Sequence, residues 1–446
     1  MKSQGIDLFL SRFPAFDREV AAYGPAWLRS IRREAIARFE ALGFPDSRQE
    51  AWRFTDVKPI ARTAFHLVTE PASNGWDRAA VERLAFPGVE GERIVFLDGL
   101  YSPELSHHCP VPDAVRIQSL AAALKEDPEP LRPFLARHAK VEENPFVALN
   151  TAYMRDGAYI RIPRGEQIRQ AIHLLFLTTA ARRAVVTHPR ILIVAEEGSR
   201  ATVVESFAGP GDQPYFTNAV TEIVVQGNAE LDHCKLQREG RGAFHIATIQ
   251  AYQERDSKVL SHSISLGARL ARNELNFVLD GEGSECTLNG LYMTTNRQHV
   301  DHHTLIDHAR PNSTSLECYK GVLDEESRGV FHGKIVVRKD AQKTNARQSN
   351  KNLLLSEGAT VHTQPQLEIY ADDVKCAHGA TIGQLDEDSL YYLRTRGLGP
   401  AEARTLLTYG FVRDITERIR IEPIRAKLET LVLARLRGAG RKREGR

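Results

Sequence analysis

The feature of this sequence that most restricts its fold is a regular spacing of turns between residues 160 and 385. Short β-branched segments, such as 190–195 and 201–207, alternate there with polar turns such as 196–199. One series of turns recurs at steps of about 29 residues, slightly shorter only before Gly283: Gly198, Gly227, Asp256, Gly283, Asn312 and Ala341. A second series recurs at the same step but out of phase with the first: Gly240, Arg269, Gln298, Ser327 and Ser356. Each period therefore contains two strands and two turns.

A fixed period with two opposed turns indicates a stack of β-coils. A single coil cannot bury its own apolar face, so its neighbours must cover it. We therefore expect a parallel β-helix over residues 151–385. An antiparallel sandwich is the alternative architecture, but sandwiches rarely keep so even a spacing.

The sequence on either side of this repeat predicts helices. Residues 26–42 carry apolar side chains near helical spacing, and Gly43 ends the run. Asp386 is suited to cap a helix that Gly397 ends, and Pro400 suits the first turn of another helix. The fold class is thus mainly β with helical ends: a helical and mixed N-terminal region (1–150), the β-helix core (151–385) and a C-terminal helical domain (386–446).

The composition narrows the cellular setting. Charged residues are 26% and hydrophobic ones 42% of the chain, as in ordinary globular proteins, and the net charge of +2 gives no sign of general nucleic-acid affinity. No apolar run approaches the ~18 residues of a membrane span, and the first residues lack the pattern of a secretory signal. The five cysteines are an odd number without a C-x-x-C pair, which is typical of reduced thiols. We therefore expect a cytoplasmic protein without a nucleic-acid or membrane partner.

The segment with the most chemical information is 366–381, which contains Cys376 and His378. In an extended strand, residues two positions apart project from the same face. A thiolate beside an imidazole suits iron, copper or an iron–sulfur fragment. Two ligands do not complete a cluster shell, so the remaining ligands would come from another chain. The pattern alone leaves a second interpretation open, in which Cys376 is a partly buried thiol and His378 a hydrogen-bonded imidazole.

A His-rich segment at 299–308 is the other group of candidate ligands. By alternation, one face of a strand would carry His299, Asp301 and His303, and the other face His302 and Thr304. The spacing does not match a known zinc motif. We therefore expect a hydrogen-bonded ladder between neighbouring coils.

Several segments together resemble the SufB/SufD family of iron–sulfur cluster assembly proteins, and its SufD branch more than its SufB branch. The block 366–383 is the most specific of them. The resemblance covers nearly the whole chain, although 61–150 matches only loosely. The other segments that carry it are 48–55 (RQEAWRFT), 299–308 (HVDHHTLIDH), 331–333 (FHG) and 352–397.

The resemblance implies a right-handed parallel β-helix and a non-catalytic scaffold subunit. It implies a SufB-like paralogue bound through the β-helix and a SufC-like ABC ATPase bound through the C-terminal helices. It also implies iron acquisition and de novo assembly of a transient Fe–S cluster at the subunit interface, with Cys376 and His378 as metal ligands there. A homodimer in isolation and a reduced flavin in the complex belong to the same set of expectations.

Some positions gain no role from the resemblance. Family members can carry a cysteine near Ser313, and serine is a poor ligand for a soft metal. Neither Cys286 nor Cys318 is assigned a function. The chain has no Gly-x-x-x-x-Gly-Lys-Ser/Thr loop, so ATP hydrolysis would belong to the partner.

Other function classes are also compatible with parts of the pattern. The chain could be the SufB-like scaffold paralogue, which shares the β-helix. A β-helix enzyme acting on polysaccharide would need closely spaced carboxylates, and a jelly-roll oxygenase would need a facial set of His and carboxylate ligands. Neither of these two enzymes explains the 366–383 block.

Overall fold

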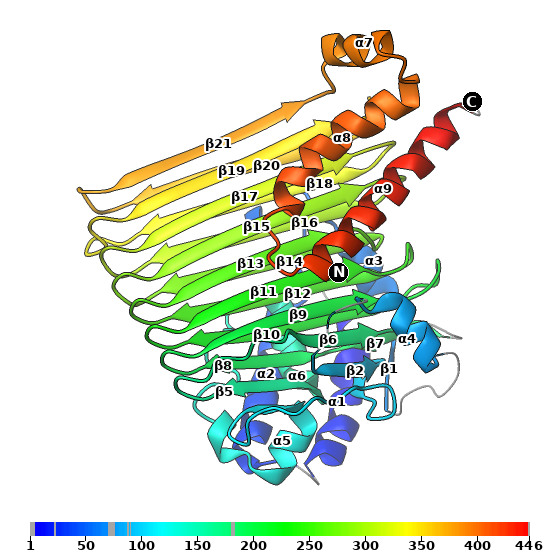
Figure 1. Cartoon of the computed structure of the whole chain (residues 1–446). Helices are drawn as coiled ribbons and strands as arrows, with labels where there is room; N and C mark the ends of the chain where they lie inside the picture. The colour runs from blue at the N-terminus through cyan, green and yellow to red at the C-terminus, as the bar shows by residue number, and fades with distance from the viewer. Residues whose placement is uncertain are drawn as a thin grey trace.

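The computed structural model of the chain describes residues 5–21, 24–69, 76–86, 89, 91–179 and 183–444. Its centre is a stack of β-coils with helices on two sides (Figure 1). The strands form an 11-stranded and a 10-stranded sheet that face each other across a common apolar core. The predicted fold class, a parallel β-helix with helical ends, is confirmed.

Each coil contributes one strand to each sheet. The first sheet contains β4 (Arg116–Ser119), β5 (Gly157–Ile162), β8 (Arg190–Ala195), β10 (Phe216–Val225), β12 (Phe244–Gln253), β14 (Leu270–Leu279), β16 (His299–His308), β18 (Arg328–Val337) and β20 (Thr360–Ile369), with β1 (His66–Leu67) and β7 (Val185–Thr187) at its side. The second contains β3 (Leu100–Tyr101), β2 (Arg93–Leu97), β6 (Ile172–Leu177), β9 (Arg200–Ala208), β11 (Glu230–Arg238), β13 (Lys258–Ser265), β15 (Glu285–Thr294), β17 (Thr314–Leu323), β19 (Asn345–Leu354) and β21 (Lys375–Gly383).

Consecutive coils pair in parallel, but the repeat is less even than predicted. Phe244 pairs with Leu270, a step shorter than the predicted period, whereas Arg328 pairs with Thr360, a step longer than that period. The hydrogen-bonded ladder requires strands that lie in register, while the turns lie at the surface and vary freely in length. The predicted period is therefore only an average.

The turns along one edge each hold a residue with positive φ close to a predicted position. These residues are Gly198, Asn228, Asp256, Gly283, Asn312 and Lys343. Glycine, Asn and Asp adopt this left-handed conformation at the least cost, so most of these positions carry the residue type that the turn requires. The first predicted series of turns therefore corresponds to one edge of the stack.

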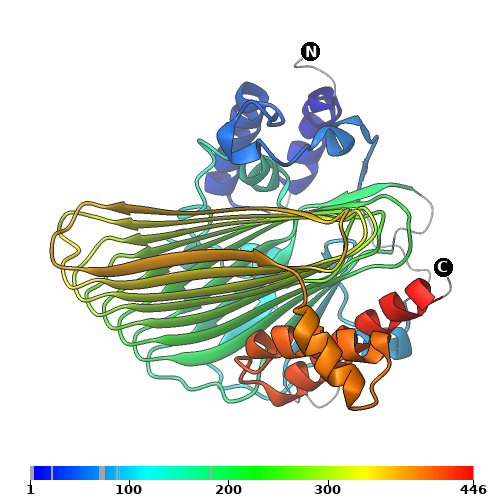
Figure 2. The same ribbon diagram turned by 90° about the horizontal axis from the view of Figure 1, so that it is seen from above.

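The N-terminal helices cover the outer face of the first sheet (Figure 2). Phe9, Phe39 and Phe146 belong to the same apolar cluster as Phe216 and Phe244 of that sheet. Burial of such large side chains is the main stabilisation of this contact. The helices on this side are α1 (Ile6–Val20), α2 (Ala26–Leu42), η1 (Glu50–Trp52), α3 (Lys58–Arg62), α5 (Leu120–Glu126), η2 (Glu129–Leu131) and α6 (Pro145–Tyr153). One N-terminal helix, α4 (Arg78–Leu84), packs on the second sheet instead, where Val81 joins the apolar cluster of Val95 and Leu175.

The C-terminal helices cover the outer face of the second sheet, opposite the N-terminal helices (Figure 2). The helices on this face are α8 (Pro400–Thr416) and α9 (Glu422–Glu444), and α7 (Glu387–Thr395), which precedes them, packs on α8. Asp386 caps α7, since its side chain accepts a hydrogen bond from the Ser389 N–H at 2.8 Å. Lys320 of β17 donates to the Phe411 carbonyl and pairs with Asp414, each at 2.9 Å, which ties α8 to the sheet.

A fully buried ion pair within the first sheet anchors a loop of the N-terminal region. The guanidinium of Arg190 lies 2.5 Å from the carboxylate of Glu222, and neither side chain is exposed. Glu222 also accepts from the backbone N–H groups of residues 136–139. Burial raises the pKa of Glu222, but the charge of Arg190 and the N–H groups outweigh it and hold the pKa below its usual value.

We predict that Glu222→Ala destabilises the protein by about 3–5 kcal/mol, because it leaves the Arg190 charge buried without a partner. Chemical denaturation followed by circular dichroism measures this change. The matched control is Glu230→Ala, which breaks the more exposed pair with Arg200 and should cost about 1 kcal/mol or less. Equal losses in the two variants would contradict the prediction.

Candidate functional site

Cys376 and His378 lie on β21, the last strand of the second sheet (Figure 1). Cys376 is half-buried and packs against the apolar core between the sheets. His378, two positions on, lies on the same face of the strand, as the alternation predicted. The two residues below them in register, Ala346 and Gln348 of β19, are 0% and 3% exposed, whereas His378 is exposed. The pair therefore lies where the interior of the β-helix opens to solvent.

The thiol of Cys376 is not activated in the chain by itself. Burial raises its pKa, and a backbone hydrogen bond from Ala346 works in the opposite direction without cancelling this effect. A thiol must lose its proton to bind iron strongly. The proton of Cys376 would therefore be displaced by the metal itself or by a cation brought close to it.

The polar residues beneath His378 were missed by the sequence reasoning. Gln348 pairs in register with His378, and Glu317 of β17 pairs with Gln348. These three residues lie in one column of the second sheet on its inner face. Each step along this column is longer than the predicted period of about 29 residues. Counting back one predicted period from His378 gives Ser349, whose side chain lies on the opposite face of β19. The in-register ladder is the signal that finds them.

The last coil also presents two unpaired strand edges. Among the described residues, β20 and β21 are the terminal strands of their sheets, each hydrogen-bonded to a strand on one side only. An exposed edge is a template for pairing with another chain. Large apolar side chains lie exposed in the same coil: Ile369 (41%), Tyr370 (63%) and Ile382 (51%).

The His-rich strand β16 has the predicted alternation of faces. His302 lies inside the β-helix, and its ring packs near Tyr292 and Tyr319. Asp301 and His303 lie on the outer face, where the Nε2 of His303 is 3.1 Å from Asp301.

The contacts of the outer face come from the coil below and from the N-terminal region. Arg272 pairs with Asp301, donates to the Ala51 carbonyl at 2.8 Å and lies 3.7 Å from the Trp52 ring centroid. Thr55 donates to Asp301 at 2.6 Å. Burial raises the pKa of Asp301, but Arg272 and His303 lower it much further, so this carboxylate is ionised. The 48–55 segment is thus fastened to the sheet by charge and stacking.

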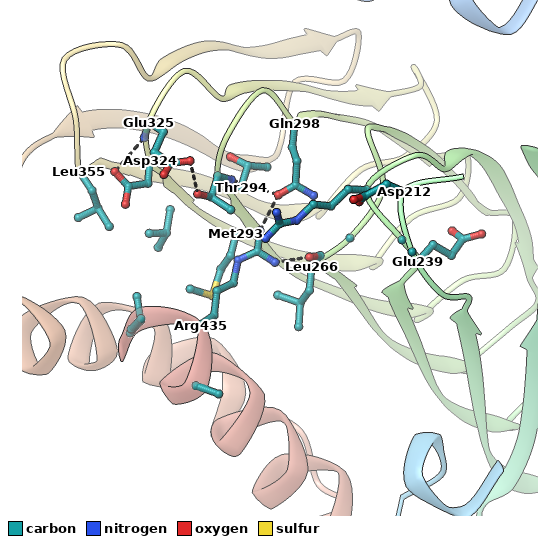
Figure 3. Close-up of a pocket in the computed structure, with 18 residues that line it drawn as sticks. Asp212, Glu239, Leu266, Met293, Thr294, Gln298, Asp324, Glu325, Leu355 and Arg435 are labelled. Atoms are coloured by element: carbon teal, nitrogen blue, oxygen red, sulfur yellow. Dashed lines mark hydrogen bonds between the residues drawn. The ribbon is translucent and has the colours of Figure 1, made fainter. Parts of the chain in front are cut away.

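A separate cleft of about 590 Å³ lies between α9 and the turns of several coils (Figure 3). The Arg435 side chain reaches from α9 into this cleft and donates to the Gln298 side chain at 2.7 Å and to the Leu266 carbonyl. Burial lowers the pKa of Arg435 to about 10, so it remains charged at neutral pH. These bonds fasten the last helix to the stack.

The remaining candidate ligands occupy structural positions. Ser313 is buried, and its hydroxyl lies 2.6 Å from the Nδ1 of His308. Cys286 lies in the apolar core, and Cys318 packs between the second sheet and the C-terminal helices. Within the residues that the structure describes, no group of three or more His, Cys, Asp or Glu side chains is arranged to hold a metal ion.

The burial pattern predicts which thiols react in the folded chain. Cys109 and Cys376 are half-buried, whereas Cys234, Cys286 and Cys318 are buried. We expect that iodoacetamide labels only the first two in the native protein, as measured by mass spectrometry, and that the rate at Cys376 rises with pH because its pKa is raised. Cys376→Ser should remove one label, and the control Cys286→Ser none. Rapid native labelling of a buried cysteine would contradict this.

Comparison with known proteins places these features in a family. Residues 176–411 match the family model "SUF system FeS cluster assembly, SufBD core domain", and residues 3–174 match "SufBD protein N-terminal region". An iron-sulfur cluster assembly SufBD family protein of Synechocystis is 35% identical over 412 residues, which cover 91% of this chain and 90% of that one. The iron-sulfur cluster assembly protein SufD of Escherichia coli is 31% identical (90% and 91% covered), and SufD of Bacillus subtilis is 26% identical (92% and 94%).

The described helices include none with the length and apolar character that crossing a membrane requires. The two family models together account for the N-terminal helices, the β-helix and the first part of the C-terminal helical region. The chain belongs to the SufB/SufD family of iron–sulfur cluster assembly proteins.

Proposed function

We propose that this chain is a SufD-like scaffold subunit that works with a SufB-like paralogue and a SufC-like ATPase in the cytoplasm. In this proposal it supports iron acquisition and cluster assembly, and the nascent Fe–S cluster is its cargo. The observation that carries the proposal is the position of Cys376 and His378, side by side where the β-helix interior opens at its last coil. A partner seated there would lie within reach of both side chains.

Cys376 and His378 alone do not provide enough ligands for a cluster, which supports a cluster shared with a partner subunit. One thiol and one imidazole supply two ligands, and a cluster usually takes four. Because Cys376 has a raised pKa, it would hold iron weakly until a partner or the metal favours its thiolate. Assembly at an interface would restrict cluster formation to the complete complex.

The unpaired edges of β20 and β21 support pairing with a paralogue of the same fold. A second β-helix could continue the ladder or pack its own last coil on Ile369, Tyr370 and Ile382. The same surface would also allow a homodimer of the isolated chain. We assign the ATPase to the other exposed apolar surface, on the C-terminal helices: Tyr391 (69%), Tyr392 (56%) and Leu406 (49%).

The scaffold has no catalytic turnover in this proposal, and ATP hydrolysis belongs to the partner, since the chain lacks a phosphate-binding loop. A reduced flavin in the complex is supported by the family resemblance alone.

The ligand role predicts that Cys376→Ala and His378→Ala each reduce iron and sulfide in the purified complex by several-fold. Thr381→Ala is the matched control, because Thr381 is an exposed residue of the same strand on the opposite face. Anaerobic iron and sulfide analysis measures the change, and thermal unfolding checks that the fold is intact. Unchanged metal content in both site variants would refute the ligand role.

The two docking surfaces predict separable losses of binding. Ile369→Lys with Ile382→Lys should weaken capture of the SufB-like subunit at least tenfold, because charges would be buried in the contact. This double variant should leave capture of the SufC-like subunit unchanged, and Leu406→Lys should do the reverse. Pull-downs with each purified partner distinguish the surfaces. If one variant abolished both interactions, the assignment of two surfaces would be wrong.

A further inference from the structure

A column of polar side chains leads from the buried core to His378. Glu317, Gln348 and His378 occupy the same register position on β17, β19 and β21. Neighbouring strands of a sheet lie about 4.8 Å apart, so consecutive side chains of such a column are within hydrogen-bonding reach. Glu317 is 0% and Gln348 is 3% exposed. Polar side chains at this depth are costly unless hydrogen bonds satisfy them.

Glu317 fixes the orientation of the Gln348 amide. The Nε2 group of Gln348 donates to the Oε2 of Glu317 at 2.6 Å. The opposite orientation would place the amide oxygen against a carboxyl oxygen. Burial raises the pKa of Glu317 to about 7, so both the ionised and the protonated forms occur near neutral pH. The Oε2 atom accepts the bond from Gln348 in the ionised form, and also in the protonated form when the proton is on Oε1. The ionised carboxylate therefore fixes this amide orientation, and the protonated form is compatible with it.

Gly333 of β18, in the first sheet, faces the same Gln348 amide across the interior of the β-helix. A Cβ atom added to Gly333 would lie 2.2 Å from the Gln348 Nε2, so the glycine makes room for this end of the side chain. With Nε2 held by Glu317, the Oε1 of Gln348 is a buried acceptor without a hydrogen-bond partner among the described residues. A buried acceptor without a hydrogen bond costs free energy, so a nearby donor would stabilise it. The next side chain in the column is that of His378.

We propose that Gln348 is a positioning residue for His378: its Oε1 accepts a hydrogen bond from one ring N–H and leaves the other ring nitrogen unprotonated for iron. The ring nitrogens of histidine are set by the hydrogen bond that one of them makes, and such a bond orients the ligand and raises its basicity. The register position beneath Cys376 is Ala346, which offers no side-chain acceptor. The proposed hydrogen bond therefore affects the imidazole of His378 and not the thiol of Cys376. Its value for cluster assembly rests on the proposed function.

The test is the tautomer of His378 in the full chain without partners, read from the ¹⁵N chemical shifts of its ring. Loss of the signal in His378→Ala identifies it. Gln348→Leu removes the acceptor and should change the tautomer ratio by about 2- to 10-fold, the effect of a hydrogen bond worth about 0.5–1.5 kcal/mol. Gln348→Glu keeps an acceptor of the same length, and a proton on one of the two carboxyl groups replaces the lost bond to Glu317. This variant should retain the wild-type tautomer. Ser349→Ala is the control on the opposite face.

Unchanged ring shifts in Gln348→Leu would overturn the proposal, and so would a change of equal size in Ser349→Ala. If Gln348→Leu fails to fold, Gln348→Glu still decides: loss of the wild-type tautomer in that folded variant contradicts the proposal. The proposed function fails separately, when His378→Ala leaves iron and sulfide in the complex unchanged while Gln348→Leu still shifts the tautomer.

Discussion

The in-register pairing of each coil with the next is the constraint on which the rest of this structure depends. It closes the backbone hydrogen bonds of every strand except along the outer edges, and it aligns equivalent positions of successive coils into columns. A column that is apolar on the inner face becomes core, and a polar column can bring hydrogen-bonding side chains together, as Glu317 and Gln348 show. The ladder also decides where the stack ends, and hence where Cys376 and His378 meet solvent.

The helical parts are fastened to this ladder by a few buried charges as well as by apolar contact. The ion pairs Arg190–Glu222 and Arg272–Asp301 lie within the first sheet, and their members also bond the N-terminal region: Glu222 accepts from the Ala136 N–H, and Arg272 donates to the Ala51 carbonyl. Arg435 fastens the last helix to the turns on the other side. Such contacts are directional, so they specify how each part sits on a face that would otherwise allow sliding.

Sequence periodicity predicted the architecture well because turn chemistry is local. Gly283 and Asn312 mark turns by their own conformational preferences, and Asp386 marks a helix start by its own side chain. Strand alternation likewise placed Cys376 and His378 on one face. The residue beneath His378 could not be predicted from the sequence. The average period points to Ser349, whereas the observed strand pairing places Gln348 there. A slip of one residue exchanges the two faces of a strand, so unequal turns defeat any fixed period. Contacts between the N-terminal region and the β-helix, such as the hydrogen bond from Thr55 to Asp301, produce no repeating pattern in the sequence.

The one-sided pairing of β20 and β21 has a consequence for the dynamics of the chain. In a stacked architecture each coil is stabilised only by its neighbours, so the free energy of local opening falls toward a coil that has one neighbour instead of two. Amide hydrogen exchange should therefore be graded along the stack and fastest in the coil that carries Cys376. Docking of a partner would supply the missing neighbour, so that ordering of this coil and formation of the complex become a single coupled equilibrium.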